Sequence, residues 1–220
     1  RLDYYAKIGT NEPSFVARIK GVGTLSAERA AEMCAVGPFA RASNVATDVR
    51  KDDPYACYDE VDFKLITHDS CDILGRVIVR VYEMIESCKI IEQLLENLPE
   101  GEIALAKVSR KVPEGVAVSR YEAPRGEDVH FVRSNGTDKP ERVRVRAPTM
   151  ANLEAATESV IGSYVADIPI AIASIDPCFS CTDRMAIVLR DPKRGTEVTT
   201  WEQLRRRGIE WYGKNKGIRF

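Results

Sequence analysis

The sequence predicts an α+β fold, a helical bundle around one long central helix with a small antiparallel sheet. A continuous helical period from about Asp72 to Leu98 predicts the long helix. Alternating apolar and polar residues over about 116–147 predict the sheet. With 44% hydrophobic and 30% charged side chains among 220 residues, the composition is that of a globular chain.

Ahead of the long helix, the sequence predicts one short helix and one loop. Ser26 is expected to cap a helix that continues through Cys34, and Gly37-Pro38 is expected to end it. The segment 39–58 has no sustained period, so we expect a long ordered loop there. Long loops in compact domains usually serve a function, which makes this segment a place to look for one.

The long helix carries an apolar stripe that other helices must cover, and Pro99 ends it. At 1.5 Å per residue the helix is roughly 40 Å long. We expect it to be a structural core helix. The stripe consists of Leu74, Val77, Ile78, Val81, Met84, Ile85, Cys88, Ile91, Leu94 and Leu95.

Beyond the sheet, whose last two strands are separated by the turn signal Asn135-Gly136, the sequence predicts a helix over about 150–164. A short apolar run over 168–175 follows it. The residues expected to face inward from the helix are Met150, Leu153, Ala156, Val160 and Tyr164.

Charge and hydropathy exclude two classes of protein. The formal net charge is -1 and the isoelectric point is about 6.3, whereas dedicated nucleic-acid binders are strongly basic. No apolar run approaches the ~18 residues of a membrane span, so we expect membrane contact only through partners. Because the chain begins at Arg1 within polar sequence, we expect it to be part of a longer polypeptide.

The sharpest chemical motif is Asp176-Pro177-Cys178-Phe179-Ser180-Cys181. A Cys-x-x-Cys pair suits one soft metal ion, but a four-coordinate site needs two further ligands. From the residues alone, a metal half-site, a redox pair and a structural pair stay open. The remaining cysteines are expected as small buried hydrophobes, and neither histidine is expected as a ligand. These residues are Cys34, Cys57, Cys71, Cys88, His68 and His130.

Two weaker motifs precede that pair. In Glu122-Ala123-Pro124-Arg125-Gly126, proline fixes the backbone before an arginine, and glycine permits close approach after it. An arginine presented in this way can bind an anion, although surface arginines beside proline are common. In the second motif, residues 146–152, Thr149 joins the sheet to the next helix and has the simple alternative of an N-cap.

Taken in order, these motifs resemble one family. The succession EAPRG, RVRVR, APT..N and SIDPCFSCTDR is similar to the C-terminal half of the large subunit of nickel-iron hydrogenases. The upstream blocks GVGTLSAERA, VGPFARASNVATDVRKDDPYACYDEVDF and IIEQLLENLPEGEI resemble a narrower set. That set comprises energy-converting, membrane-associated hydrogenases and the related 49 kDa quinone-site subunit of respiratory complex I. The similarity covers about residues 19–184.

The resemblance implies a bimetallic centre of nickel and iron, with carbon monoxide and cyanide on the iron. Two Cys-x-x-Cys motifs hold that centre in the family. Cys178 would be a terminal nickel thiolate and a proton acceptor, and Cys181 a nickel-iron bridge. The other two ligands would lie upstream of Arg1, so we expect the fragment alone to be inactive. The implied reaction is reversible heterolysis of H2, with electrons leaving through iron-sulfur clusters in a partner subunit.

The resemblance also assigns roles around that centre. Arg125 would overhang the metals and bond a cyanide ligand, and Asp176 would pair with this arginine and orient it. Pro124, Pro148 and Thr149 would line the pocket around the diatomic ligands, with Thr149 offering its hydroxyl. The implied partners are an iron-sulfur small subunit, membrane subunits and a maturation protease or chaperone. The implied location is the cytoplasmic face of the membrane, reached through those subunits.

Two departures from the family pattern refine this expectation. Arg184 stands where many hydrogenases have a histidine, which favours the energy-converting branch. Complex I relatives lack the cysteines, so Cys178 and Cys181 favour a hydrogenase. We expect residues 1–184 to form the C-terminal part of the large-subunit domain. The extension 185–220 is either clipped after Arg184 once nickel is loaded or kept to dock a partner.

Two rival functions remain at this point. The first is a complex I-like quinone or ferredoxin oxidoreductase subunit that kept two cysteines without a nickel-iron centre. The second is an independent binding module in which Cys178 and Cys181 share a structural zinc.

Overall fold

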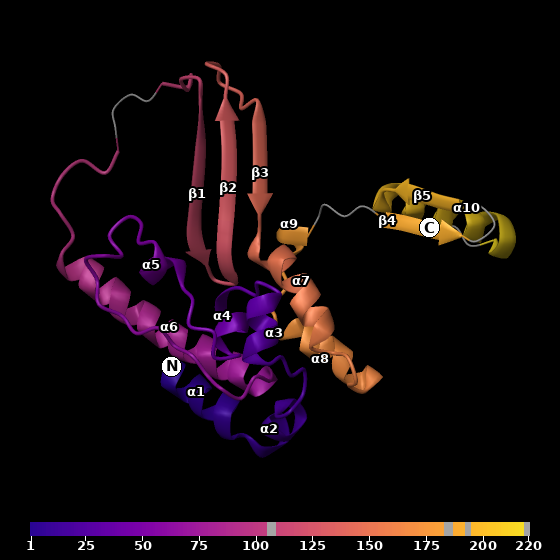
Figure 1. The fold of residues 1–220 in the computed structure, drawn as a ribbon, viewed down its shortest axis with the longest axis horizontal. Helices are drawn as coiled ribbons and strands as arrows, with labels where there is room; N and C mark the ends of the chain where they lie inside the picture. Colours follow the sequence, from indigo (N-terminus) through magenta and orange to yellow (C-terminus); the bar gives the residue numbers. More distant parts are fainter. Residues whose placement is uncertain (105–108, 183–186, 192–194, 218–220) are drawn as a thin grey trace. The chain divides into compact units, whose positions relative to one another are not determined.

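The structure, a computed structural model, describes residues 1–104, 109–182, 187–191 and 195–217. The chain forms two compact units, Arg1–Cys178 and Phe179–Phe220. Both contain helices and antiparallel strands, which confirms the predicted α+β class. Figure 1 shows the elements in chain order.

The first unit contains one helix much longer than its neighbours, α6 (Ile73–Glu96), close to the predicted bounds. The carboxylate of Asp72 caps it by accepting a hydrogen bond from the Gly75 amide at 2.9 Å. Helices α1, α2 and α4 contact α6. The helices that precede it are α1 (Leu2–Asn11), α2 (Pro13–Ile19), α3 (Ala27–Glu32), α4 (Gly37–Arg41) and α5 (Val49–Asp52).

The expectation of a continuous loop over 39–58 is wrong, because α4 extends into this segment and α5 lies within it. Ser26 caps α3 as predicted, but Gly37-Pro38 begins α4 instead of ending a helix. Proline is tolerated in the first turn, where its missing N–H has no intrahelical acceptor. Asp48 caps α5 through the Arg50 amide. Both helices are too short for their sequences to show a helical period.

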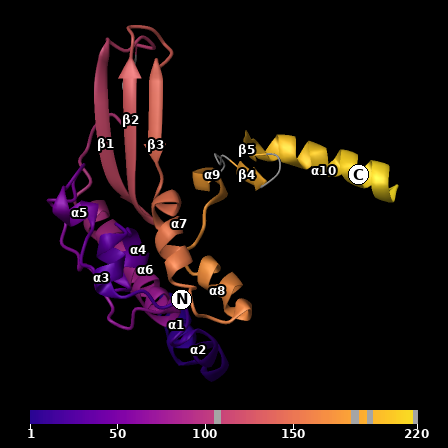
Figure 2. The ribbon, with the colours of Figure 1, turned by 45° about the vertical axis from the view of Figure 1, so that its right-hand side comes forward.

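The predicted sheet is confirmed as three antiparallel strands in the order β1-β2-β3. They are β1 (Gly115–Ala123), β2 (Gly126–Ser134) and β3 (Arg142–Arg146). Ala123 pairs with Gly126, so only two residues join β1 to β2. Figure 2 shows that this turn is the end of the sheet nearest α4 and α7, both of which contact β2.

The helix expected over 150–164 is shorter and begins earlier, as α7 (Pro148–Glu158). Met150 is 43% exposed and Tyr164 is 84% exposed, so their predicted inward orientation is wrong. Gly162, with φ +81°, lies in the turn after α7. A 3-10 turn (Val165–Asp167) and α8 (Ile168–Ala173) complete the first unit.

The buried side of α6 differs from the predicted stripe. Met84 and Ile91 are exposed, whereas Val79 and Ile90 are buried. The buried side also includes the charged Arg76, which a search for apolar residues omits. The largest core cluster lies instead between α3, α4 and α7 and the turn after α8. It consists of Leu25, Ala30, Ala35, Phe39, Ala40, Ala155, Ala156 and Ile175.

The second unit contains α9 (Phe179–Thr182), the hairpin β4 (Ile187–Asp191) and β5 (Gly195–Thr199), and α10 (Trp201–Lys216). Thr200 and Gln203 form a capping box at the start of α10. The expected cleavage position after Arg184 lies outside the described residues. In the part of the chain that the structure describes, no helix combines the length and apolarity needed to cross a membrane.

Candidate functional site

The turn that carries Arg125 is seated directly on the start of α4. A Cβ atom added to Gly37 would lie 2.4 Å from the Gly126 Cα and 2.5 Å from the Arg125 carbonyl oxygen. Gly37 also has φ +68°, in the left-handed region. Glycine is therefore required at position 37 both for its backbone conformation and for this approach. The contact fixes where the turn sits.

Asn152, in α7, binds the residue that precedes Gly37 and so stabilises the same contact. Its side-chain oxygen accepts a hydrogen bond from the Val36 amide at 2.9 Å, and its nitrogen donates to the Val36 carbonyl at 3.1 Å. Asn152 is 1% exposed, so both bonds are shielded from water. The APT..N motif thus connects α7 to the residue just before Gly37. The sequence marks this asparagine, but only the structure shows its partner.

Arg125 and Asp176, 51 positions apart, form an ion pair. The Arg125 Nη2 donates to the Asp176 Oδ1 at 3.2 Å, and Nε lies 3.1 Å from Oδ2. Nε also donates to the Asp176 main-chain carbonyl. Asp176 has φ +56° and its amide donates to the Ala173 carbonyl at 3.0 Å, so it closes a tight turn after α8. The pair is half-buried, with 29% of the arginine and 48% of the aspartate side chain exposed.

Thr149 reaches the cysteine motif from the first turn of α7. Its hydroxyl oxygen accepts a hydrogen bond from the Cys178 amide at 3.3 Å, and the side chain is 1% exposed. Pro148 is buried beside it, whereas Pro124 is exposed. Ala147 is the N-cap of α7, so the simpler interpretation of Thr149 as the cap is wrong.

A cavity of about 370 Å³ adjoins the Arg125–Asp176 pair. Burial lowers the pKa of Arg80 in its wall, and the nearby cations Arg125 and Arg41 act in the same direction. The Arg80 Nε is buried and has no hydrogen-bond partner among the described residues. The cavity is lined by Arg41, Arg50, Arg80, Glu83, Met84, Ser87, Glu122, Ala123, Pro124 and Asp176.

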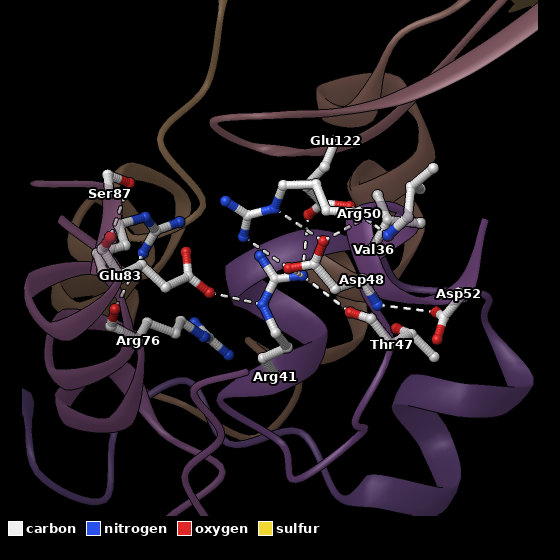
Figure 3. A network of polar contacts seen from close by, with 12 residues as sticks. Val36, Arg41, Thr47, Asp48, Arg50, Asp52, Arg76, Glu83, Ser87 and Glu122 are labelled. Atoms are coloured by element: carbon white, nitrogen blue, oxygen red, sulfur yellow. Dashed lines mark hydrogen bonds and ion pairs between the residues drawn. The ribbon is translucent and has the colours of Figure 1, made fainter. Parts of the chain in front are cut away.

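A buried charge network forms part of the cavity lining, and sequence reasoning did not find it (Figure 3). Arg41, at its centre, is 1% exposed. Its Nε donates to Glu83 at 2.6 Å, and its Nη1 donates to Glu122 at 2.9 Å. Asp48 adds a third carboxylate at 3.5 Å and binds Arg50 at 2.6 Å. The network joins α4, α5, α6 and β1.

The pKa shifts in this network reflect one cation shared among several acids. Burial works against the charge on Arg41, but Glu83 and Glu122 raise its pKa above the ordinary value. Burial also raises the pKa of Glu122, although Arg41 opposes that shift. The raised pKa of Arg41 and the raised pKa of Glu122 are compatible, because Arg41 interacts with Glu83 and Asp48 as well as with Glu122. The pKa of Asp48 is lowered despite its burial, since Arg50 and Arg41 both stabilise its charge.

The sulfur donors available to a metal are limited. Among the described residues, no group of three His, Cys, Asp or Glu side chains is arranged to hold a metal ion. Cys178 ends the first unit and Cys181 lies in α9 of the second. Two thiolates fit half of a four-thiolate centre and do not complete one. Cys34 and Cys88 are exposed, so the expectation that they are buried is wrong.

The chain matches the model of one protein family, the respiratory-chain NADH dehydrogenase 49 kDa subunit, over residues 1–111 and 104–184. The chain belongs to this family. The match ends at Arg184, so it includes the Arg125 turn, Thr149 and both cysteines of the metal-type motif.

Particular relatives include both hydrogenases and subunits of NADH-quinone oxidoreductase. The carbon monoxide-induced hydrogenase of Rhodospirillum rubrum is 42% identical over 172 residues, 78% of this chain and 47% of the relative. An NADH-quinone oxidoreductase subunit of Desulfitobacterium hafniense is 41% identical, over 84% of this chain and 50% of the relative. Formate hydrogenlyase subunit 5 of Escherichia coli is 36% identical, over 90% of this chain and 34% of the relative. The chain therefore spans half or less of the length of these relatives.

Proposed function

We propose that the chain is the C-terminal part of the catalytic subunit of an energy-converting nickel-iron hydrogenase. Its reaction is the reversible heterolysis of H2, with electrons passing to iron-sulfur clusters in a partner subunit. The observation that carries the proposal is the bonding of Arg125 to Asp176, two residues before Cys178. This contact brings a cationic hydrogen-bond donor to a residue of the thiolate motif, and a preorganised donor of this kind can stabilise charge that develops in a reaction.

Cys178 and Cys181 would supply two of the four thiolates that hold nickel and iron. The donor set fits, because both are soft sulfur ligands and the pair amounts to half of such a site. When bound, the bimetallic centre would polarise H2 for heterolysis. The other two thiolates would come from outside these 220 residues, so the isolated chain is expected to be inactive.

The chain's own residues would act around that centre. Arg125 would point its remaining donors toward an iron-bound cyanide, with Asp176 fixing the plane of the guanidinium. The Thr149 oxygen accepts from the Cys178 amide, and its hydroxyl proton has no acceptor among the described residues. That proton would bind a second diatomic ligand. Pro124 and Pro148 would line this pocket, and the Cys178 thiolate would accept the proton released from H2.

The proposal also places the chain in a complex. An iron-sulfur small subunit would receive the electrons, and membrane subunits would hold the enzyme at the cytoplasmic face of the membrane. A maturation protease, with its chaperone, would cut between Arg184 and Met185 after nickel loading. Mass spectrometry of protein from nickel-replete cells should find Arg184 as the C-terminus, and a C-terminus still at Phe220 would remove the cleavage hypothesis.

A second candidate is a complex I-like subunit that transfers electrons between quinone or ferredoxin and its partners without a nickel-iron centre. The family match and the relatives named as NADH-quinone oxidoreductase subunits support it. The cysteine pair favours the hydrogenase, since a subunit without a metal centre does not need two soft metal ligands at Cys178 and Cys181.

Metal analysis of the full-length protein, purified within its complex, tests these alternatives. Nickel and iron together with infrared bands from carbon monoxide and cyanide would support the hydrogenase. Absence of nickel and of those infrared bands would favour the complex I-like subunit. One zinc per chain would favour a structural zinc site. Replacing both cysteines with serine is the matched control, because it should abolish the nickel, the infrared bands or the zinc and leave the iron of the partner's iron-sulfur clusters.

A further inference from the structure

Arg76, on α6, is buried without a carboxylate partner. It is 1% exposed, and among the described residues no acid lies within ion-pair distance of it. Burial, together with Arg80 one turn further along, lowers the pKa of Arg76 to about 9, although the charge of Asp72 acts in the opposite direction. Burying a guanidinium is costly, so the contacts that hold Arg76 in place are of interest.

The guanidinium of Arg76 connects three segments of the chain. Nη1 donates to the Ser174 hydroxyl at 2.7 Å, and Nη2 donates to the Gly23 carbonyl. The central carbon lies 4.3 Å from the centre of the Phe39 ring, which is fully buried in α4. A planar fork with two separated donors and a stacking face is particular to arginine.

One of these segments carries Asp176, and another supports the turn that carries Arg125. Ser174 follows α8, and its hydroxyl donates to the Ala171 carbonyl at 2.6 Å, which fixes the end of the helix two residues before Asp176. Phe39 belongs to α4, whose first residue, Gly37, is the seat of the Arg125 turn. Arg76 therefore touches the support of each partner and neither partner itself.

From this arrangement we infer that Arg76 is a positioning residue, which holds the turn of Asp176 and the seat of Arg125 in register. The inference rests on the proposed function for its effect on turnover, but the geometric part does not depend on any metal. Loss of the fork would free the Ser174–Cys178 turn relative to α4. The Arg125 guanidinium would then lose its orientation while remaining present.

The test compares R76M and R76K with V79A in the full-length protein within its complex. Val79 is fully buried on the same helix, so V79A weakens the packing of α6 while keeping the hydrogen bonds of Arg76 to Ser174 and Gly23. Hydrogen exchange is measured at the Asp176 and Cys178 amides, and hydrogen turnover is measured together with metal content at a temperature where all variants are folded.

R76M should accelerate exchange at both amides and lower kcat by about 10²-fold with metal content and KM retained, as misplacement of a catalytic group does. R76K keeps the charge but has a single donor nitrogen, so its exchange rates and its kcat should lie between those of R76M and the wild type. V79A should exchange faster along α6 only and keep its turnover. Equal exchange of both amides in R76M and V79A would overturn the inference. A wild-type protein without hydrogen turnover would instead refute the proposed function, and the exchange comparison would still decide the role of Arg76.

Discussion

Two of the arginine–carboxylate groups in the first unit differ in burial and in the number of acids that bind the cation. Arg41 is 1% exposed and is bound by acids from α5, α6 and β1. Arg125 is 29% exposed and is bound by one residue, Asp176, which is 48% exposed. A buried cation bound by several acids holds together the elements that carry those acids, whereas a half-exposed cation keeps hydrogen-bond donors for a ligand. The comparison separates a charge that maintains the fold from a charge that acts on a ligand.

Removing the buried cation should have the largest effect. R41M leaves Glu83 and Glu122 without their cation, and breaking a buried pair in this way costs about 3–5 kcal/mol. R125M should change the free energy of unfolding by less, about 1 kcal/mol, because solvent screens this half-exposed pair. Urea denaturation of both variants measures the difference. Equal losses of unfolding free energy would contradict the assignment of Arg41 to stability and of Arg125 to ligand binding.

The seat of the Arg125 turn gives the next largest effect. G37A forces a left-handed alanine against the Gly126 backbone, and it should cost about 2–5 kcal/mol from strain and overpacking together. Gly136 is the matched control, since it has φ +80° and no atom within 4 Å of an added Cβ. G136A should therefore cost only the strain, about 1 kcal/mol. Thermal unfolding measures both losses of stability. Equal losses in G37A and G136A would contradict the close approach of Gly37 to the Gly126 backbone.

Asp48 and Glu122 should give opposite pH dependences of stability. The lowered pKa of Asp48 contributes stability that is present above its ordinary value of about 4 and is lost as the pH falls. The raised pKa of Glu122 contributes stability that is present below its ordinary value and is lost as the pH rises through the folded value. D48N should flatten the acid limb of a plot of unfolding free energy against pH, and E122Q should steepen it. The reverse pattern would contradict the assigned directions.

The hydrogen bond from Cys178 to Thr149 should give the smallest effect. T149V removes the acceptor of the Cys178 amide at nearly constant volume, and the loss should be about 1 kcal/mol. T149S keeps the hydroxyl and controls for the change in the side chain. Amide exchange at Cys178 should accelerate in T149V and stay unchanged in T149S. Faster exchange in T149S together with unchanged exchange in T149V would show that the methyl contact, and not the hydroxyl, orders this segment.

Local sequence patterns predicted the elements whose periodicity is long enough to detect. The long α6 and the three strands follow from hydrophobic spacing, and the Asp176–Arg125 pairing followed from resemblance to a family. Helices α4 and α5 were missed because four or five residues carry no period. The central role of Arg41 gave no signal, since its acids are between 7 and 81 positions away and only folding brings them together. Arg76 was missed because a cation on a buried helical face contradicts the hydrophobic pattern.

The most direct test of the proposed function is R125K in the complete enzyme, with hydrogen turnover and bound nickel and iron measured on the same preparation. Lysine keeps the charge but lacks the planar fork that meets Asp176 and a ligand together. Turnover should fall by roughly 10²-fold, as expected when a preorganised donor is removed, while the metal content stays at the wild-type level. Turnover close to that of the wild type would contradict the placement of Arg125 over a bimetallic centre.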